Sequence, residues 1–311
     1  MNETRSYHGQ PVLKEPVWTW EIPCYLFTGG LAGASAGLAY LCELRGDEVL
    51  ARRAWGGAFA GIAVSPALLI SDLGRPRRFL NMLRLFKVTS PMSVGSWILT
   101  VSATTTAIAT AHSWLGVCPR LAALARPAAA LAGLPLSTYT GALVANTAVP
   151  VWHESRQMLP FVFASGAGLS AGAAGLIATP PRDAGAARRL ALGSVVVEMA
   201  TKELMERRLG DHGEPYRVGA AKRFGDLGRG CLLAGSAVLL WRGASSRRAA
   251  LAAGTLLLTG ALSARWSVFK AGFTSVADPK YVVGPQRERV RTGTRRGAAR
   301  SRPHAAAAPG P

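Results

Sequence analysis

The stretch IPCYLFTGGLAGASAGLAYLC, residues 22–42, decides the fold of this chain. It is long enough to cross a bilayer as a helix, which takes about 20 predominantly apolar residues. Gly29, Gly33 and Gly37 recur at every fourth position, so they share one face of that helix. Small residues at this spacing let helices approach closely in a membrane. The stretch therefore predicts a closely packed membrane helix.

Seven further apolar stretches follow along the chain, at about 54–71, 93–112, 128–149, 157–178, 189–207, 228–241 and 249–268. We therefore expect an all-α fold, a polytopic integral membrane bundle of about eight transmembrane helices. Eight helices could form two four-helix bundles. The stretch 228–241 is short, so a seven-span topology or a re-entrant seventh segment stays open. The stretch 189–207 carries several charges in its second half and is the least apolar of the eight.

Composition divides the chain into three parts: a polar N-terminal segment (1–17), a transmembrane domain (18–278) and a basic tail (279–311). The tail is rich in Arg, Gly, Ala and Pro and lacks apolar periodicity, so we expect it to be disordered. Its basic residues supply much of the net charge of +19. Attraction to anionic lipid headgroups explains this charge without a nucleic-acid partner.

The distribution of Lys and Arg bears on orientation. With eight spans both termini lie on one side, and that side carries more basic residues than the other. The positive-inside rule then places both termini in the cytoplasm, although most of the difference comes from the tail. No cleavable signal peptide is expected, because the first residues are polar and the first apolar block is long enough to span. We expect a multi-pass protein of a bacterial cytoplasmic membrane.

Cysteine and histidine positions argue against a metal centre in this chain. An iron–sulfur cluster or a structural zinc needs clustered thiolates, and the cysteines show no CxxC pair. A bis-histidine haem needs two imidazoles at similar membrane depth, whereas His112 and His153 fall near opposite faces. We therefore expect no haem, no iron–sulfur cluster and no metal site. The four cysteines are Cys24, Cys42, Cys118 and Cys231.

The most distinctive segment is the basic loop between the second and third spans, residues 72–92. Its stretch 77–86 predicts a short amphipathic helix at the membrane interface, and Ser93 is a candidate cap for the third span. The loop is either a basic interfacial segment or a docking surface for a peripheral subunit. The arginines that would form such a surface are Arg75, Arg77, Arg78 and Arg84.

Residues 72–97 resemble the loop typical of the NrfD/polysulfide-reductase membrane-subunit family. Three other stretches are similar to the same family: residues 18–30, which enter the first span, Tyr139-Thr140-Gly141 in the fourth, and Val149-Pro150-Val151-Trp152 at its end. The resemblance is strong over residues 18–160 and rests on the number of spans for the remainder.

The resemblance implies a haem-free, eight-helix subunit that exchanges electrons and protons with a membrane quinone, menaquinone or ubiquinone. It also implies a ferredoxin-like partner with several [4Fe–4S] clusters and, usually, a molybdopterin catalytic subunit. On this interpretation the chain has no catalytic residues of its own and acts only within an oxidoreductase complex. A secondary transporter, a proton-translocating protein and a purely structural anchor remain as alternatives.

Four polar residues are candidates for the quinone site, because ionisable groups in a membrane are costly and are functional candidates by default. They are Glu21, Tyr25, Asp72 and Tyr139, which could converge near one face. In the family, polysulfide reductases have an Asn and a His on the first helix where Ile22 and Tyr25 stand here, so Glu21 or Tyr25 would have to substitute. Tyr139 could instead bond a neighbouring helix, and Asp72 could cap a helix or pair with Arg75.

Glu198 and Lys202 lie four residues apart in the sixth span, a spacing that lets side chains pair on a helix. One interpretation is an internal ion pair that eases the burial of both charges. The other is a proton-relay element within the membrane.

Overall fold

The computed structural model describes residues 13–72 and 77–283. This part of the chain is all-helical, and each of the eight predicted apolar stretches falls on a helix of 20 residues or more, which confirms the all-α class. These helices are α1 (Glu21–Leu44), α2 (Glu48–Asp72), α4 (Pro91–Leu115), α5 (Pro119–Ala145), α7 (Leu159–Ala178), α8 (Gly185–Leu209), α9 (Gly219–Arg242) and α10 (Arg247–Ala277). Three short elements complete the fold: α3 (Arg77–Met82), α6 (Pro150–Glu154) and the 3₁₀ helix η1 (Gly210–Tyr216).

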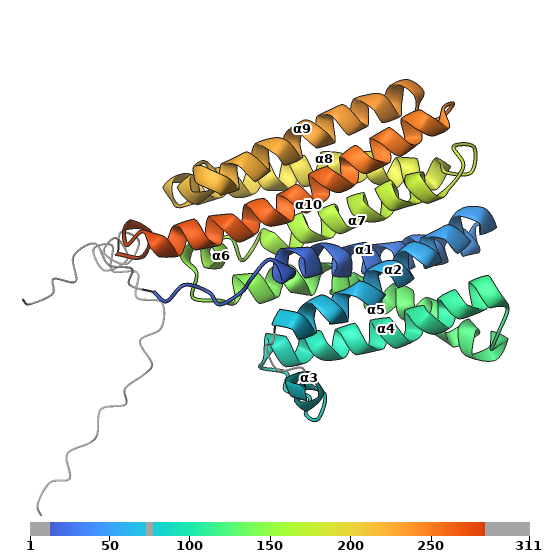
Figure 1. The fold of residues 1–311 in the computed structure, drawn as a ribbon, viewed down its shortest axis with the longest axis horizontal. Helices are drawn as coiled ribbons and strands as arrows, with labels where there is room; N and C mark the ends of the chain where they lie inside the picture. Colours follow the sequence, from blue (N-terminus) through green and yellow to red (C-terminus); the bar gives the residue numbers. More distant parts are fainter. Residues whose placement is uncertain (1–12, 73–76, 284–311) are drawn as a thin grey trace, which may run out of the picture.

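Five of the described helices are both long and apolar enough to cross a membrane: α1, α2, α4, α5 and α7. The remaining long helices, α8, α9 and α10, carry more charge along their length. They nevertheless run beside the five apolar helices over comparable distances (Figure 1). The chain is therefore an all-helical protein with at least five membrane-span candidates among its described residues.

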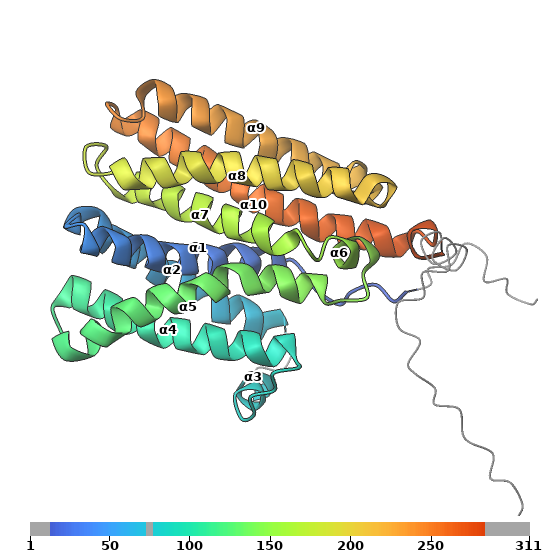
Figure 2. The same cartoon turned by 180° about the vertical axis from the view of Figure 1, so that it is seen from behind.

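The long helices form two groups that pack against each other (Figures 1 and 2). One group contains α1, α2, α4 and α5, and the other contains α7, α8, α9 and α10. The contacts between the groups are made chiefly by α7, which packs against α1, α5 and α2, and by α10, which packs against α1. We call the end that holds Glu21, α3 and Ala277 the proximal end, and the opposite end, which holds Arg45, Gly116 and Ser246, the distal end.

Small residues let the helices of the first group approach closely. A Cβ added at Gly33 of α1 would overlap the carbonyl of Gly133 in α5, and one at Gly61 of α2 would lie 2.8 Å from the carbonyl oxygen of Thr28. Backbone contact of this kind is available only to glycine. The predicted packing role is thus confirmed for Gly33, whereas a Cβ at Gly37 would meet nothing within 4 Å.

Several helices extend beyond the stretches that apolarity marked out. α2 begins at Glu48 instead of residue 54, α9 begins at Gly219 instead of residue 228, and α10 continues to Ala277. Charged residues continue these helices outside the apolar region, because backbone hydrogen bonding does not depend on apolar side chains. The predicted seventh stretch belongs to α9, which is one continuous helix of 24 residues and is not among the five membrane-span candidates.

The first residues of the predicted tail are helical. Residues 279–283 form a helical turn, in which the N–H groups of Val282 and Val283 donate to the carbonyl oxygen of Pro279 at 3.1 and 2.9 Å. The rest of the tail, 284–311, lies outside the described residues.

The basic loop differs from its prediction in two respects. The short helix α3 ends at Met82, not at residue 86. The N-cap of α4 is Ser90, whose side chain accepts from the Ser93 N–H at 3.4 Å, so the capping role assigned to Ser93 was wrong. The Ser93 hydroxyl instead donates to the carbonyl oxygen of Leu85 and accepts from the Lys87 N–H, both at 3.0 Å. It thereby fixes the loop against the start of α4.

Candidate functional site

Two of the candidate residues are in direct contact at the proximal end. The hydroxyl of Tyr25, on α1, is hydrogen-bonded to the hydroxyl of Tyr139, on α5. Tyr25 is only 1% exposed, and Tyr139 is half-buried. A bond from Tyr139 to a neighbouring helix was the alternative left open by the sequence, and its partner is another candidate for the same site. The mutual bond uses one phenol proton and leaves the second free to donate elsewhere.

The surroundings of Tyr139 explain the glycines near it. A Cβ at Gly95 of α4 would lie 2.8 Å from Cζ and 2.9 Å from Oη of Tyr139, so only glycine leaves room for this ring. Two residues beyond Tyr139, a Cβ at Gly141 would lie 2.9 Å from the carbonyl oxygen of Leu159 in α7. The Tyr139-Thr140-Gly141 segment therefore directs the phenol to α1 and α4 and brings α5 against α7.

The two candidate carboxylates are bridged by a residue that the sequence did not single out, Thr19. Its N–H and its hydroxyl lie 3.3 Å from Oδ1 of Asp72, and the same hydroxyl contacts Oε2 of Glu21. Thr19 is exposed, whereas Glu21 and Asp72 are partly buried. The position of Thr19 inside the family-like stretch 18–30 was the available signal for it. The result is a row of polar groups that reaches the surface at the proximal end.

Stacked aromatic rings join the start of the domain to its last helix. Trp18 stacks on Trp152 of α6, with ring centroids 5.6 Å apart, and Trp152 stacks in turn on Phe269 of α10 at 6.4 Å. The Trp152 indole N–H donates to the carbonyl oxygen of Val268 at 2.7 Å. The segments 18–30 and 149–152, far apart in the sequence, therefore meet at the same end of the bundle as the tyrosine pair.

The described part of the basic loop presents an exposed surface at the proximal end. Arg84 is exposed, and it is followed by Leu85 and Val88, which are 72% and 74% exposed. The loop is held in place by Phe86, whose ring meets Trp97 of α4 edge-on at 6.3 Å. Of the other arginines expected here, Arg75 and the side chains of Arg77 and Arg78 lie outside the described residues.

A second polar group lies in the other half of the protein. Glu198 of α8 is 1% exposed, and neither of its carboxylate oxygens has a hydrogen-bond partner among the described residues. Two cations attract this carboxylate electrostatically: Lys202 of the same helix and Arg265 of α10. Arg265 is 2% exposed and donates to the carbonyl oxygen of Phe163 at 2.9 Å. Arg265 was not among the residues predicted from the sequence, although an arginine within an apolar stretch was an available signal.

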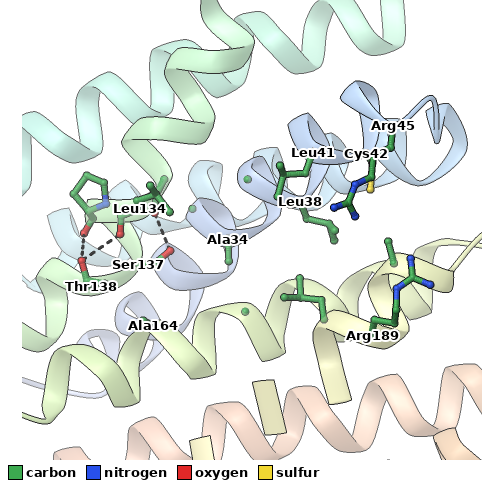
Figure 3. Close-up of a pocket in the computed structure, with 17 residues that line it drawn as sticks. Ala34, Leu38, Leu41, Cys42, Arg45, Leu134, Ser137, Thr138, Ala164 and Arg189 are labelled. Atoms are coloured by element: carbon green, nitrogen blue, oxygen red, sulfur yellow. Dashed lines mark hydrogen bonds between the residues drawn. The ribbon is translucent and has the colours of Figure 1, made fainter. Parts of the chain in front are cut away.

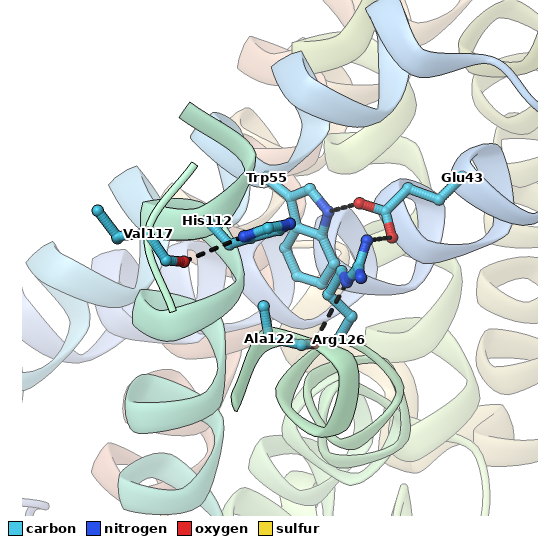
Figure 4. A network of polar contacts seen from close by, with 6 residues as sticks. All are labelled: Glu43, Trp55, His112, Val117, Ala122 and Arg126. Carbon is cyan, nitrogen blue, oxygen red and sulfur yellow. Dashed lines mark hydrogen bonds and ion pairs between the residues drawn. The ribbon is translucent and has the colours of Figure 1, made fainter. Parts of the chain in front are cut away.

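The histidines are placed as the sequence indicated. His112 lies in the last turns of α4 at the distal end, where its Nδ1 is 3.0 Å from the carbonyl oxygen of Val117 (Figure 4). His153 belongs to α6 at the proximal end. Beside His112, Trp55 donates to Glu43 at 2.8 Å and Arg126 pairs with the same carboxylate at 3.5 Å. Among the described residues, no three His, Cys, Asp or Glu side chains form a group that could hold a metal ion.

Comparison with known proteins connects this geometry to one family. A search of curated proteins found no match. A family model of the NrfD type, described as polysulfide reductase, matches residues 5–279, which is most of the chain and includes all four segments that meet at the proximal end. The chain thus belongs to the NrfD/polysulfide-reductase family of membrane subunits.

Proposed function

We propose that this chain is the quinone-reactive membrane anchor of a multi-subunit respiratory oxidoreductase. One observation carries the proposal: the family-like segments converge at the proximal end, around the hydrogen-bonded Tyr25–Tyr139 pair. Menaquinone or ubiquinone would be the exchangeable substrate, and a bound quinone supplies the redox chemistry by taking up two electrons and two protons. The residues that surround the tyrosine pair are suited both to binding a quinone and to moving its protons.

The site combines an apolar wall with hydrogen-bond donors. Tyr25 belongs to a core cluster with Ile22 and Leu136, against which Tyr139 packs. The second phenol proton of the tyrosine pair is available to donate to a quinone carbonyl, which has only acceptor capacity. Such a pairing of apolar surface with a few placed polar groups is typical of small-molecule sites.

Protons need a path between the tyrosine pair and water. Glu21 is one helical turn before Tyr25, and Thr19 links Glu21 to Asp72 and to the surface. Carboxylates and hydroxyls can pass a proton along a hydrogen-bonded row. We assign this row the exchange of protons with the proximal aqueous side.

Electrons would come from, or leave to, a [4Fe–4S] partner subunit, and a molybdopterin subunit would complete the enzyme. The basic loop is the surface we assign to the partner, because Arg84 and the exposed Leu85 and Val88 combine charge with apolar area. Replacing Arg77, Arg78 and Arg84 together with Glu should release the iron–sulfur subunit from membranes. Unchanged co-purification of the two subunits would contradict this assignment.

We also propose that α8, α9 and α10 cross the membrane with the five apolar helices, which gives eight spans and places both termini on one side. The positive-inside rule favours the cytoplasmic side of a bacterial cell membrane for them. A reporter fused to the C-terminus tests this: activity of a periplasm-dependent reporter would reverse the orientation.

The test of the proposed function uses the intact complex, purified with its iron–sulfur partner. Tyr139→Phe and Tyr25→Phe remove the hydroxyls of the pair and should lower quinone-dependent turnover at least tenfold, a typical effect for loss of a proton-transfer group. Tyr40→Phe, farther along the same helix α1, serves as the matched control and should leave turnover within twofold. Full turnover in both site variants would reduce the chain to a structural anchor.

Proton translocation is a second candidate function, favoured by the buried carboxylate of Glu198, which has no hydrogen-bond partner among the described residues and is attracted by Lys202 and Arg265. Buried intramembrane charges of this kind mark proton relays and ion paths. Glu198→Gln should then abolish acidification coupled to quinone turnover in proteoliposomes while turnover itself continues. If coupled proton movement persists in Glu198→Gln, these charges have a structural role.

A further inference from the structure

A cavity of about 690 Å³ lies between α1, α5, α7 and α8 (Figure 3). None of Glu21, Tyr25, Asp72 and Tyr139 lines it. The volume falls within the roughly 300–1,000 Å³ typical of sites that enclose small ligands. Two of its lining residues, Leu41 and Leu134, are 54% and 65% exposed, so the cavity reaches the outer surface of the bundle, where lipid would lie.

The lining is divided into an apolar part and a charged part. Glycine, alanine and leucine side chains of the four helices form most of the wall, and Ser137 and Thr138 lie at one end (Figure 3). Arg45 and Arg189 lie at the other end, which is the distal end of the bundle. Arg45 follows the last residue of α1, and Arg189 belongs to the first turns of α8. The two guanidinium groups come from different halves of the protein, and Cys42 lines the cavity with them.

The two arginines have no ion-pair partner in the part of the chain that the structure describes. Nearby carboxylates have other contacts: Glu43 binds Trp55 and Arg126, and Asp47 accepts from the Leu50 N–H at 3.3 Å. Two cations at the same end of a cavity, neither held in an ion pair with a described residue, attract an anion, and guanidinium groups suit the geometry of a phosphate.

The hydroxyls at the other end of the cavity do not offer a comparable site. Ser137 donates to the carbonyl oxygen of Gly133 at 2.8 Å, and Thr138 donates to that of Leu134 at 3.2 Å. Their protons are therefore used within α5 and are not directed at a ligand carbonyl. This favours a ligand with an apolar chain and one anionic head over a quinone, which needs donors at its carbonyls.

We propose that this cavity binds an anionic phospholipid, with an acyl chain between α1, α5, α7 and α8 and the phosphate at Arg45 and Arg189. The lipid would contact both helix groups and would connect the first half of the protein to the second. Basic pockets between membrane helices are suited to such headgroups.

The experiment measures lipid binding to the purified, delipidated full chain in detergent by native mass spectrometry. The probes are phosphatidylglycerol, phosphatidylcholine and inorganic phosphate, each titrated separately. Phosphatidylglycerol should bind at least tenfold more tightly than phosphatidylcholine, and inorganic phosphate should compete only weakly because it lacks the acyl chain. The Arg45→Gln/Arg189→Gln variant should weaken phosphatidylglycerol binding roughly thirtyfold, since each arginine near an anionic headgroup is worth about a fivefold factor.

A second variant tests the chain-binding part of the cavity. Gly37 lines the cavity, and a Cβ there would meet nothing within 4 Å, so Gly37→Leu should fill the space without displacing the backbone. It should reduce binding of phosphatidylglycerol and phosphatidylcholine alike. The matched controls are Gly193→Leu, at an open position of α8 outside the lining, and Arg120→Gln/Arg248→Gln, which removes two exposed distal arginines outside it.

The outcomes separate lipid from other occupants. Equal affinity for the two phospholipids, or full phosphatidylglycerol binding in Gly37→Leu, would overturn the proposal. The proposal would also be overturned if Gly37→Leu released a bound quinone and not a bound phospholipid. Because the readout is lipid binding to the isolated chain, it is independent of whether the tyrosine pair reacts with quinone.

Discussion

Gly95→Ala is a minimal perturbation of the candidate quinone site. A Cβ at this position would lie 2.8 Å from Cζ and 2.9 Å from Oη of Tyr139, well inside van der Waals contact. The ring must move, and the nearest consequence is loss of its hydrogen bond to Tyr25. Overpacking of this kind costs about 1–3 kcal/mol. If that energy is lost from positioning the phenol, quinone-dependent turnover should fall roughly 5- to 150-fold.

The control for this prediction is a second glycine beside the same tyrosines. A Cβ at Gly29 would lie 3.9 Å from Oγ of Ser65 and 4.0 Å from the ring of Tyr25, which is ordinary contact. Gly29→Ala should therefore keep turnover within about twofold. Alanine also raises helix propensity by about 1 kcal/mol over glycine, so neither variant is expected to lose folded protein.

The assay is steady-state oxidation or reduction of a soluble quinone analogue by the intact complex, normalised to folded protein. Gly95→Ala should lower the maximal rate, and Gly29→Ala should not. Equal rates for the two variants would refute the claim that the position of Tyr139 controls the reaction.

Three further predictions concern stability and charge. Gly133→Ala should destabilise the fold by about 1–3 kcal/mol, because the new Cβ would overlap the backbone of α1, whereas Gly193→Ala, at an open position, should not; denaturant titration in mixed micelles compares them. Lys280 lies 3.0 Å from Glu214 and holds the pKa of that carboxyl below its ordinary value, so the pair stabilises the native state at neutral pH and this contribution is lost as pH falls through the lowered pKa. Lys280→Gln should move the pKa of Glu214 back up, as an NMR titration would detect. Arg247→Ala should cost about 1–3 kcal/mol in the same denaturant titration, because its side chain donates to three carbonyl oxygens at the end of α7, and no loss would contradict this capping role.

Helix positions were predictable because apolarity over a whole stretch reports membrane burial directly. Helix ends were not, since backbone hydrogen bonds continue through charged turns: α2 begins at Glu48 and α10 ends at Ala277, both beyond the apolar window. The residue that caps a helix was equally hard to predict. Ser90 and Ser93 are equally good capping residues by type, and only the path of the loop decides which of them begins α4.

The contacts among the four candidate residues were only partly predictable from the sequence. The helical spacing of Glu21 and Tyr25 places them on one face of α1. No local sequence pattern indicates that Tyr139 of α5 is hydrogen-bonded to Tyr25 of α1. Thr19 was missed because an exposed threonine before a helix is ordinary in composition, and its role depends on Asp72, 53 residues later. Arg265 was missed for a related reason, since its compensation comes from carbonyl oxygens of α7 and from Glu198 of α8.

The central claim is that quinone binds at the Tyr25–Tyr139 pair. Photo-crosslinking with an azido-quinone, followed by peptide mapping of the intact complex, tests it most directly. We expect label on the start of α1 and on α5 near Tyr139, with loss of label in Tyr139→Phe. Label on the α7 and α8 walls of the cavity that Arg45 and Arg189 line, unaffected by Tyr139→Phe, would contradict this binding site.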